Sequence, residues 1–317
     1  MDPLWCFSHQ HFLQSHQGSF NERQQKVNLI HFHSFDYNAL LIGSSRMTVH
    51  NPATLPENIK AFNIAFDAMR LYEFNEYIEH TKKANKKDFE YIIIGLDFVT
   101  IIGKDPNQLP LDTYQKTTLS PGYRYKMLLG YDTLVRSLKN LRNHLMGGVK
   151  NKFKTYDENY VAHAFLRKPD EIQTIITNYT ESMSMENIKY DRTNYLNAIR
   201  TLKRNNPNTR FIVFTTPMPA PVVNKLLSSP NNQRTFNLWV NDIYREFGPF
   251  WHFFSTNMIT QNYPLYFVDE AHYTSEVANC INQKLFHESC QNALFKNFGL
   301  YITSPDTLNT VIQKPIP

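Results

Sequence analysis

The sequence has few cysteines, and their spacing excludes the frameworks that cysteine-rich proteins use. The 317 residues include three cysteines, Cys6, Cys280 and Cys290, and no two of them have the CxxC spacing of structural zinc ligands. We therefore predict neither a zinc site nor a disulfide framework. The sequence alone leaves open whether Cys280 and Cys290 form a bridge.

Long hydrophobic runs are also absent. A membrane-spanning helix needs about 20 apolar residues, whereas the longest candidate, 91–103, is shorter and contains Asp97. The first residues lack a basic segment followed by an apolar one, so no signal peptide is visible. The sequence has no dense lysine and arginine tract interleaved with aromatic residues, which argues against nucleic acid as a partner.

Histidines near the N-terminus do not form a metal-binding pattern. His9, His11, His16, His31 and His33 include H-x-H pairs, but no matching block of carboxylates follows them. Such pairs are more often solvated or packed than ligating, so we predict no metal site and no cofactor.

The sequence is rich in core-forming residues. Apolar residues make up 42% of the chain and aromatic residues 14%, including 23 Phe and 18 Tyr, which is typical of a folded globular protein. The formal net charge of +5 is spread over the whole chain. The length suits a single α/β domain that carries an insertion.

Apolar runs of strand length alternate with helical patterns. The runs are bounded by Gly, Pro, Asn or Ser, which favours strands buried on both faces. The predicted strands are 39–44, 61–66, 90–99, 210–216 and 250–254, and the predicted helices are 71–84, 127–145, 195–202, 236–247 and 275–286. This alternation predicts a mostly parallel sheet with helices on both faces.

The domain organisation follows from the same patterns. Residues 1–35 show no clean period and are predicted to be an N-terminal extension. Residues 36–317 then form the α/β domain, and about 104–190 lacks strand alternation, so we predict a largely helical insertion there.

Chemistry-bearing residues follow the first predicted strand and precede a late helix. The strand ends in Gly43-Ser44-Ser45-Arg46, which is either a turn whose hydroxyls cap the following residues or the position of a nucleophile. A nucleophilic serine needs a base, and the base needs an orienting group. Asp269 and His272, in a D-x-x-H pattern, supply both residue types. If Ser45 is the nucleophile, these residues complete a catalytic set of Ser45, His272 and Asp269, at the carboxyl ends of the strands, where parallel sheets bind ligands.

The G-S-S block after the first strand and the late D-x-x-H block together resemble the SGNH/GDSL hydrolase superfamily. The G-S-S variant followed by a charged residue is most similar to cell-envelope acyl-transfer members, such as the D-alanine transfer protein and alginate-acetylation-type proteins. The matching blocks span 40–277 but contain few identities. The resemblance implies a flavodoxin-like three-layer fold and assigns the nucleophile to Ser45 rather than Ser44.

The resemblance also assigns an oxyanion hole, where this chain departs from the family pattern. Ala68 stands at or beside a family glycine, and its backbone N–H can still serve as a donor. Asp97 replaces a family asparagine, and an ionised carboxylate would repel a developing oxyanion. Asp97 therefore pairs with a cation such as Arg46 or Arg70, or another donor serves, or the chain is not a competent hydrolase. Arg46 itself is either a surface ion-pair partner or a ligand for an anionic substrate group.

These observations lead to three hypotheses. The first is a serine O-acyltransferase or esterase that acts on envelope polysaccharide. The second is a catalytically silent SGNH-fold binding protein of an envelope assembly, and the third is a plain soluble carboxylesterase. For the first, the resemblance implies an acyl donor, a carbohydrate acceptor and a membrane-bound acyl-transfer partner. It also implies a domain outside the cytoplasm, anchored by a segment ahead of residue 1.

Overall fold

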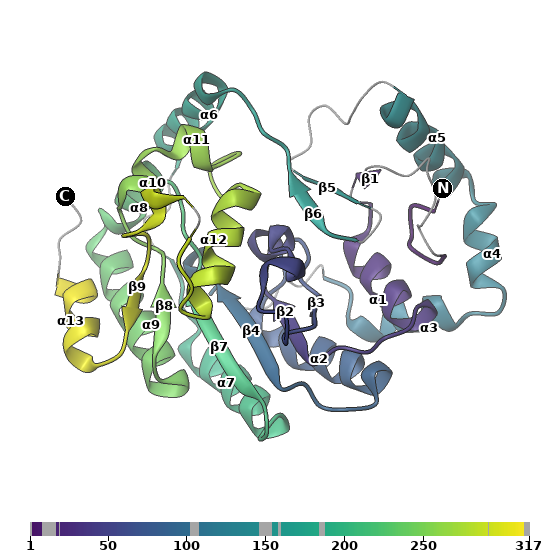
Figure 1. Cartoon of the computed structure of the whole chain (residues 1–317), viewed down its shortest axis with the longest axis horizontal. Coiled ribbons are helices and arrows are strands. Elements are labelled where there is room, and N and C mark those ends of the chain that lie inside the picture. The colour runs from purple at the N-terminus through teal and green to yellow at the C-terminus, as the bar shows by residue number, and fades with distance from the viewer. Residues whose placement is uncertain are drawn as a thin grey trace.

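A six-stranded sheet with helices on both faces forms the centre of the protein (Figure 1). The computed structural model describes residues 2–7, 17–18, 20–101, 108–145, 154–157, 160–183, 188–290 and 292–313. The sheet order is β3-β2-β4-β7-β8-β9. Its strands are β2 (Ala39–Ile42), β3 (Ala61–Asn63), β4 (Tyr91–Leu96), β7 (Arg210–Thr215), β8 (Phe250–His252) and β9 (Leu300–Ile302).

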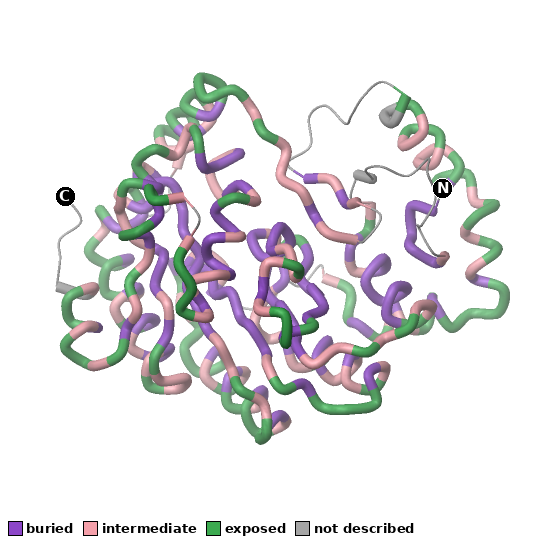
Figure 2. Tube along the Cα trace, in the orientation of Figure 1, coloured by how far each residue is buried: buried purple, intermediate pink, exposed green. Residues whose placement is uncertain are grey.

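The first five strands of this sheet are parallel, and β9 runs antiparallel to β8. The prediction of a mostly parallel sheet is therefore confirmed, and the arrangement is compatible with a three-layer α/β fold. Every residue of β2 is buried, as is β4 from Ile92 onward, because both faces of these strands are covered. Figure 2 shows the buried chain concentrated along these central strands.

Helices connect the strands and cover the sheet. The long helices are α1 (Glu22–Phe32), α2 (Leu71–Asn85), α6 (Pro169–Ser182), α7 (Arg192–Asn205), α9 (Pro230–Phe247) and α12 (Ser275–Leu285). The shorter ones are α8 (Ala220–Leu227), α10 (Met258–Gln261), α11 (Tyr263–Tyr266) and α13 (Pro305–Gln313). Helices α2, α7 and α9 pack in succession, while α12 packs against the 3-10 helix that follows β2.

The region of the predicted insertion contains both helices and strands. Helices α3 (Leu111–Leu119), α4 (Tyr123–Leu128) and α5 (Tyr131–Leu145) precede β5 (Lys154–Tyr156) and β6 (Ala162–Ala164). Strand β5 pairs with both β6 and β1 (Gln17–Gly18), so that the three form a separate sheet of order β1-β5-β6. The single helix predicted over 127–145 is wrong in one respect, because the chain breaks it at Gly130 into α4 and α5.

Residues near the N-terminus join the main core. In α1, Val27 and Ile30 are buried in the same hydrophobic cluster as the central strands. Two ionisable side chains of this helix, Glu22 and Lys26, are also buried. The disulfide that the sequence left open is formed between Cys280 and Cys290. Within the described residues, no helix is both long enough and apolar enough to cross a bilayer.

Candidate active site

Ser45 lies directly beyond the carboxyl end of β2. It is the first residue of a short 3-10 helix, η1 (Ser45–Val49). The Met47 side chain of this helix packs directly on the backbone of Gly43 and Gly95, where no larger residue fits. A Cβ atom added to Gly43 would lie 2.4 Å from Met47 Cγ, and one added to Gly95 would lie 2.4 Å from Met47 Sδ. Glycine at the ends of two neighbouring strands thus lets Met47 seat the helix that presents Ser45.

A continuous chain of hydrogen bonds links Ser45 to the late block. Ser45 Oγ lies 2.8 Å from His272 Nε2, and His272 Nδ1 lies 2.8 Å from each carboxylate oxygen of Asp269. Since the carboxylate accepts from Nδ1–H, it favours the tautomer whose Nε2 can accept the serine proton. The structure thus brings together the three predicted catalytic residues, although Ser45 and His272 are 227 positions apart.

The local fold of the D-x-x-H segment orients Asp269. Its Oδ1 accepts the backbone N–H groups of Ala271 and His272 at 2.9 and 2.8 Å. Burial alone would raise the pKa of Asp269, but the hydrogen bonds and charge of His272 and these two N–H groups outweigh it and hold the pKa below its ordinary value. The carboxylate therefore remains ionised at neutral pH.

Backbone and side-chain bonds close the loop that carries this pair. The N–H of Val268 donates to the carbonyl of His272 at 2.9 Å, so that Asp269 and His272 stand at the tip of a tight turn. Arg167 Nη1 donates to the carbonyl of Val268 at 2.6 Å. Thr274 caps α12 immediately afterwards, as its residue type predicts. The imidazole is thus held by a short, well-bonded segment.

Asp97 and Arg46 are bonded to one another rather than directed to open space. Asp97 is buried at the end of β4, and its Oδ2 lies 3.2 Å from Arg46 Nη1. It also accepts the hydroxyl of Ser44, and that of Thr216 at 2.5 Å. Of the two cations proposed to pair with Asp97, the structure selects Arg46 and not Arg70.

Arg46 connects the segment of Ser45 to the loop of Asp269 and His272. Its Nε donates to the carbonyl of Ala271 at 2.9 Å, within the loop that holds Asp269 and His272. Arg46 is an ion-pair partner, as one of the two interpretations held, but that interpretation placed it wrongly at the surface, since Arg46 is buried. The hydroxyls of Ser44 and Ser45 have different partners. Ser44 is buried and bonds Asp97, whereas Ser45 bonds His272.

Ala68 lies in an exposed turn after β3 and has a φ of 56°, in the left-handed region that is unfavourable for a residue with a side chain. An ionic cluster, in which Lys154 and Glu22 are buried, fixes this turn. Lys154 Nζ lies 2.6 Å from Glu22 and from Asp67, and the Asp67 N–H donates to Glu22 at 2.8 Å. Asp67, the residue before Ala68, is therefore held through both its backbone and its side chain.

Lys154 also contacts the segment that contains Ser45. Lys154 Nζ donates to Thr48 Oγ1 at 3.2 Å, and the Thr48 hydroxyl donates to the carbonyl of Ser45 at 2.6 Å. Lys154 thus bridges the segments of Ser45 and Ala68. Sequence reasoning missed this residue, because nothing near position 154 indicates partners that are 87 and 106 positions away.

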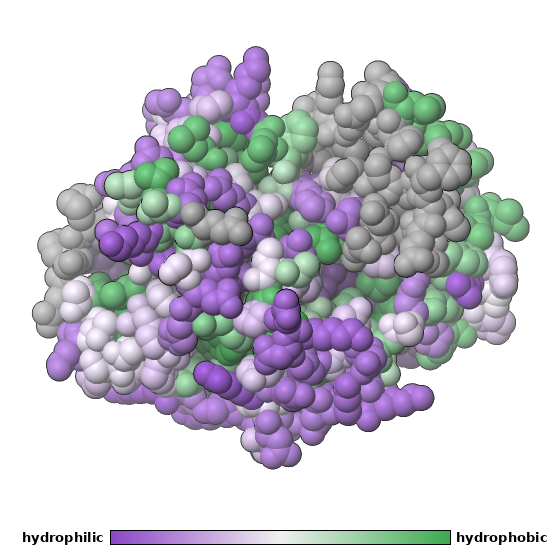
Figure 3. Space-filling model, in the orientation of Figure 1, coloured by the Kyte–Doolittle hydropathy of each residue, from purple (hydrophilic) through white to green (hydrophobic). Residues whose placement is uncertain are grey.

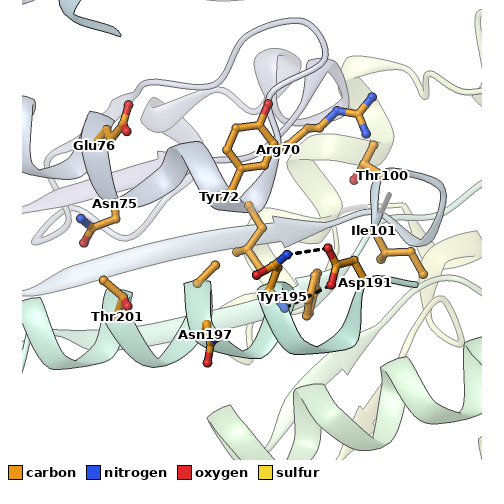
Figure 4. Close-up of a pocket in the computed structure, with 13 residues that line it drawn as sticks. Arg70, Tyr72, Asn75, Glu76, Thr100, Ile101, Asp191, Tyr195, Asn197 and Thr201 are labelled. Carbon is orange, nitrogen blue, oxygen red and sulfur yellow. Dashed lines mark hydrogen bonds between the residues drawn. The ribbon is translucent and has the colours of Figure 1, made fainter. Parts of the chain in front are cut away.

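A groove of about 530 Å³ lies between the beginnings of α2 and α7 (Figure 4). Arg70, which lines it, is two residues beyond Ala68, and Thr100 bonds the carbonyl of Asp97 through both its N–H and its hydroxyl. Ser45 itself does not line the groove. The lining is Arg70, Leu71, Tyr72, Asn75, Glu76, Thr100, Ile101, Asp191, Asn194, Tyr195, Asn197, Ala198 and Thr201.

No group of three or more His, Cys, Asp or Glu suited to a metal ion occurs among the described residues. His9, His11 and His16 lie outside those residues. Comparison of the sequence with protein-family models and with curated proteins finds no match.

Proposed function

We infer that this protein is a serine-dependent acyl-transfer enzyme. The observation that carries the inference is the chain of hydrogen bonds, each 2.8 Å long, from Asp269 through His272 to Ser45. An ordered nucleophile, base and orienting carboxylate define this chemistry irrespective of fold. The likeness to the SGNH/GDSL pattern of G-S-S and D-x-x-H supports the same reaction class.

The reaction divides into two proton-balanced steps. In the first, His272 Nε2 accepts the Ser45 proton as Oγ attacks an ester carbonyl, and the resulting imidazolium returns that proton to the departing alkoxide. In the second, a sugar hydroxyl or water loses its proton to Nε2 and attacks the acyl-enzyme. Ser45 Oγ then leaves and regains the proton, so the enzyme returns to its initial state.

Backbone N–H groups are the donors proposed for the tetrahedral intermediate. The Ser45 N–H begins η1 and therefore has no partner within that helix. The Ala68 N–H lies in the exposed turn that Lys154 and Glu22 fix. Asp97 does not fit a donor role, because its oxygens accept from Ser44, Thr216 and Arg46. We assign Asp97 to positioning instead.

A carbohydrate acceptor is supported by the groove beside these segments. Its lining includes three asparagines, Asn75, Asn194 and Asn197, whose amides both donate to and accept from hydroxyl groups. The Cys280–Cys290 bridge favours an oxidising compartment outside the cytoplasm. Together with the family likeness, these features support envelope polysaccharide as the substrate class and an extracytoplasmic location.

One observation favours a second candidate, a catalytically silent binding protein. The position that the family uses for a third oxyanion donor holds Asp97, and Arg46 neutralises it without freeing a donor. A silent protein would keep the fold and the groove but would not form an acyl-enzyme.

Labelling with a fluorophosphonate separates the two candidates. We expect the reagent to modify Ser45, to fail with Ser45→Ala, and to label Ser44→Ala as a matched control. Absence of labelling, together with no turnover of aryl acetates, would favour the binding protein. With an active enzyme, acceleration of ester turnover by added sugar indicates a transferase, and turnover by water alone indicates the plain esterase.

A further inference from the structure

Helix α5 is amphipathic, but it packs against the protein through its polar side. Tyr131, Leu134, Leu138, Leu141 and Leu145 recur at helical spacing and define one apolar face. All but Leu141 are exposed, whereas Thr133 is buried. A helix that belonged to the core of its own chain would have the opposite orientation.

The exposed apolar surface extends beyond α5. Tyr125 of α4 and Leu129, which precedes Gly130, are also exposed, and Leu129 is 88% accessible. Figure 3 shows hydrophobic side chains gathered along the edge of the molecule formed by α4 and α5. We call this surface the α4–α5 face: Tyr125, Leu129, Tyr131, Leu134, Leu138 and Leu145.

Basic side chains accompany the α4–α5 face. Residues 123–145 contain five Lys or Arg but only one acidic residue, Asp132. Arg124 and Arg136 stack on Phe7 and Phe20 and anchor the two helices to the chain. The remaining three basic side chains, Lys126, Lys139 and Arg142, are exposed.

We propose that the α4–α5 face docks on an anionic lipid bilayer. Apolar side chains flanked by lysine and arginine are the combination that places a helix in the plane of a membrane interface. Tyrosine suits the same depth, because its ring is apolar and its hydroxyl polar. The cations complement lipid phosphates, and their long aliphatic stems let the charged groups stay in the headgroup region.

The charge distribution argues against a second copy as the occupant. A two-fold dimer pairs a surface with itself. Such a dimer would bring together two copies of a surface that carries Lys126, Lys139 and Arg142, with Asp132 as the one acidic residue of 123–145 in each chain. A bilayer surface that contains anionic lipid has the opposite charge and lacks this repulsion.

Vesicle flotation tests the proposal. We expect the protein to float with vesicles of phosphatidylcholine and phosphatidylglycerol, to float much less with phosphatidylcholine alone, and to be released by salt, which screens the attraction. The double variant Leu134→Gln/Leu138→Gln should weaken binding roughly tenfold or more. Circular dichroism should show that this variant keeps the wild-type fold, and Leu145→Gln provides a second, milder variant.

A matched control removes two equally exposed leucines elsewhere. Leu238 and Leu294 are 48% and 53% accessible, compared with 52% and 55% for Leu134 and Leu138. Leu238→Gln/Leu294→Gln should bind vesicles like the wild type. The proposal is overturned if the wild type does not float, or if the two double variants bind alike. It is also overturned if the α5 substitutions abolish self-association in sedimentation while vesicle binding is unaffected, which would identify a dimer interface.

Discussion

The buried ion pair between Arg46 and Asp97 gives a prediction whose size follows from the geometry. The two side chains are 5% and 2% accessible, and their charged atoms lie 3.2 Å apart. At an effective dielectric constant of about 20, unit charges at this separation attract by roughly 5 kcal/mol. Much of this is offset by the free energy of removing both ions from water. The pair as a whole therefore contributes little net stability, whereas either charge alone would be strongly destabilising.

A double-mutant cycle separates these two effects. We expect Arg46→Met and Asp97→Asn each to lower the free energy of unfolding by about 3–5 kcal/mol, because each leaves a buried charge without its partner. The free energy of unfolding lost in the double variant should be smaller than the sum of the two single losses. The difference, which is the coupling energy between Arg46 and Asp97, should be at least about 2 kcal/mol. Urea unfolding followed by circular dichroism measures all four proteins.

The exposed pair of Lys87 and Asp36 provides the control, since it has a short separation of 2.6 Å but both side chains face water. The matching cycle there should show no coupling beyond experimental error. The reasoning is refuted if the Arg46 and Asp97 substitutions are additive, or if the exposed pair couples as strongly. Either result would mean that burial does not determine the strength of the contact.

Three further predictions concern the buried lysines and the triad. Lys154→Met should lower ester turnover at least tenfold, because it releases the segments of Ser45 and Ala68 together; exposed Lys116→Met is the control, and equal turnover in both would contradict the bridging role. Burial, only partly offset by Glu22, lowers the pKa of Lys26 from 10.5 to about 7. Between these values the unfolded chain binds a proton that the native state lacks, so the free energy of unfolding should rise with pH from about 7 to 9. Urea unfolding at a series of pH values measures this rise, and Lys26→Met should reduce it. An equal rise with pH in the variant would be contrary evidence. Asp269→Asn should lower turnover by roughly three to four orders of magnitude with little change in unfolding, since the favoured His272 tautomer is lost; near-normal turnover would exclude the carboxylate from the mechanism.

The features that the sequence predicted are those with a strong local pattern. The central strands follow from continuous apolar runs, and the D-x-x-H spacing lets Asp269 bond the ring and backbone of His272 within one turn. Strand β9 was missed, because Leu300–Ile302 is an edge strand of three residues, too short for its apolar pattern to distinguish it from a loop. Helix α13, which follows β9, is not among the predicted helices.

Long-range polar contacts and the direction of a helix face were beyond the reach of pattern analysis. Arg46 bonds the carbonyl of Ala271 across 225 positions, and a backbone acceptor leaves no residue-type signal. Periodicity correctly indicated helix at 131–145, but it does not specify whether the leucine face meets the core or the solvent. Leu134 and Leu138 face outward because α5 packs through its polar side, which the chain as a whole determines.

Direct detection of the acyl-enzyme is the measurement that tests the central claim most closely. When the protein is mixed with an aryl acetate and quenched in acid, the account predicts that the mass of one acetyl group is added, and peptide mapping should place it on Ser45. The adduct should be absent from Ser45→Ala and should form far more slowly in His272→Ala. Acetylation at another residue, or an equal rate without the imidazole, would contradict proton transfer from Ser45 to His272.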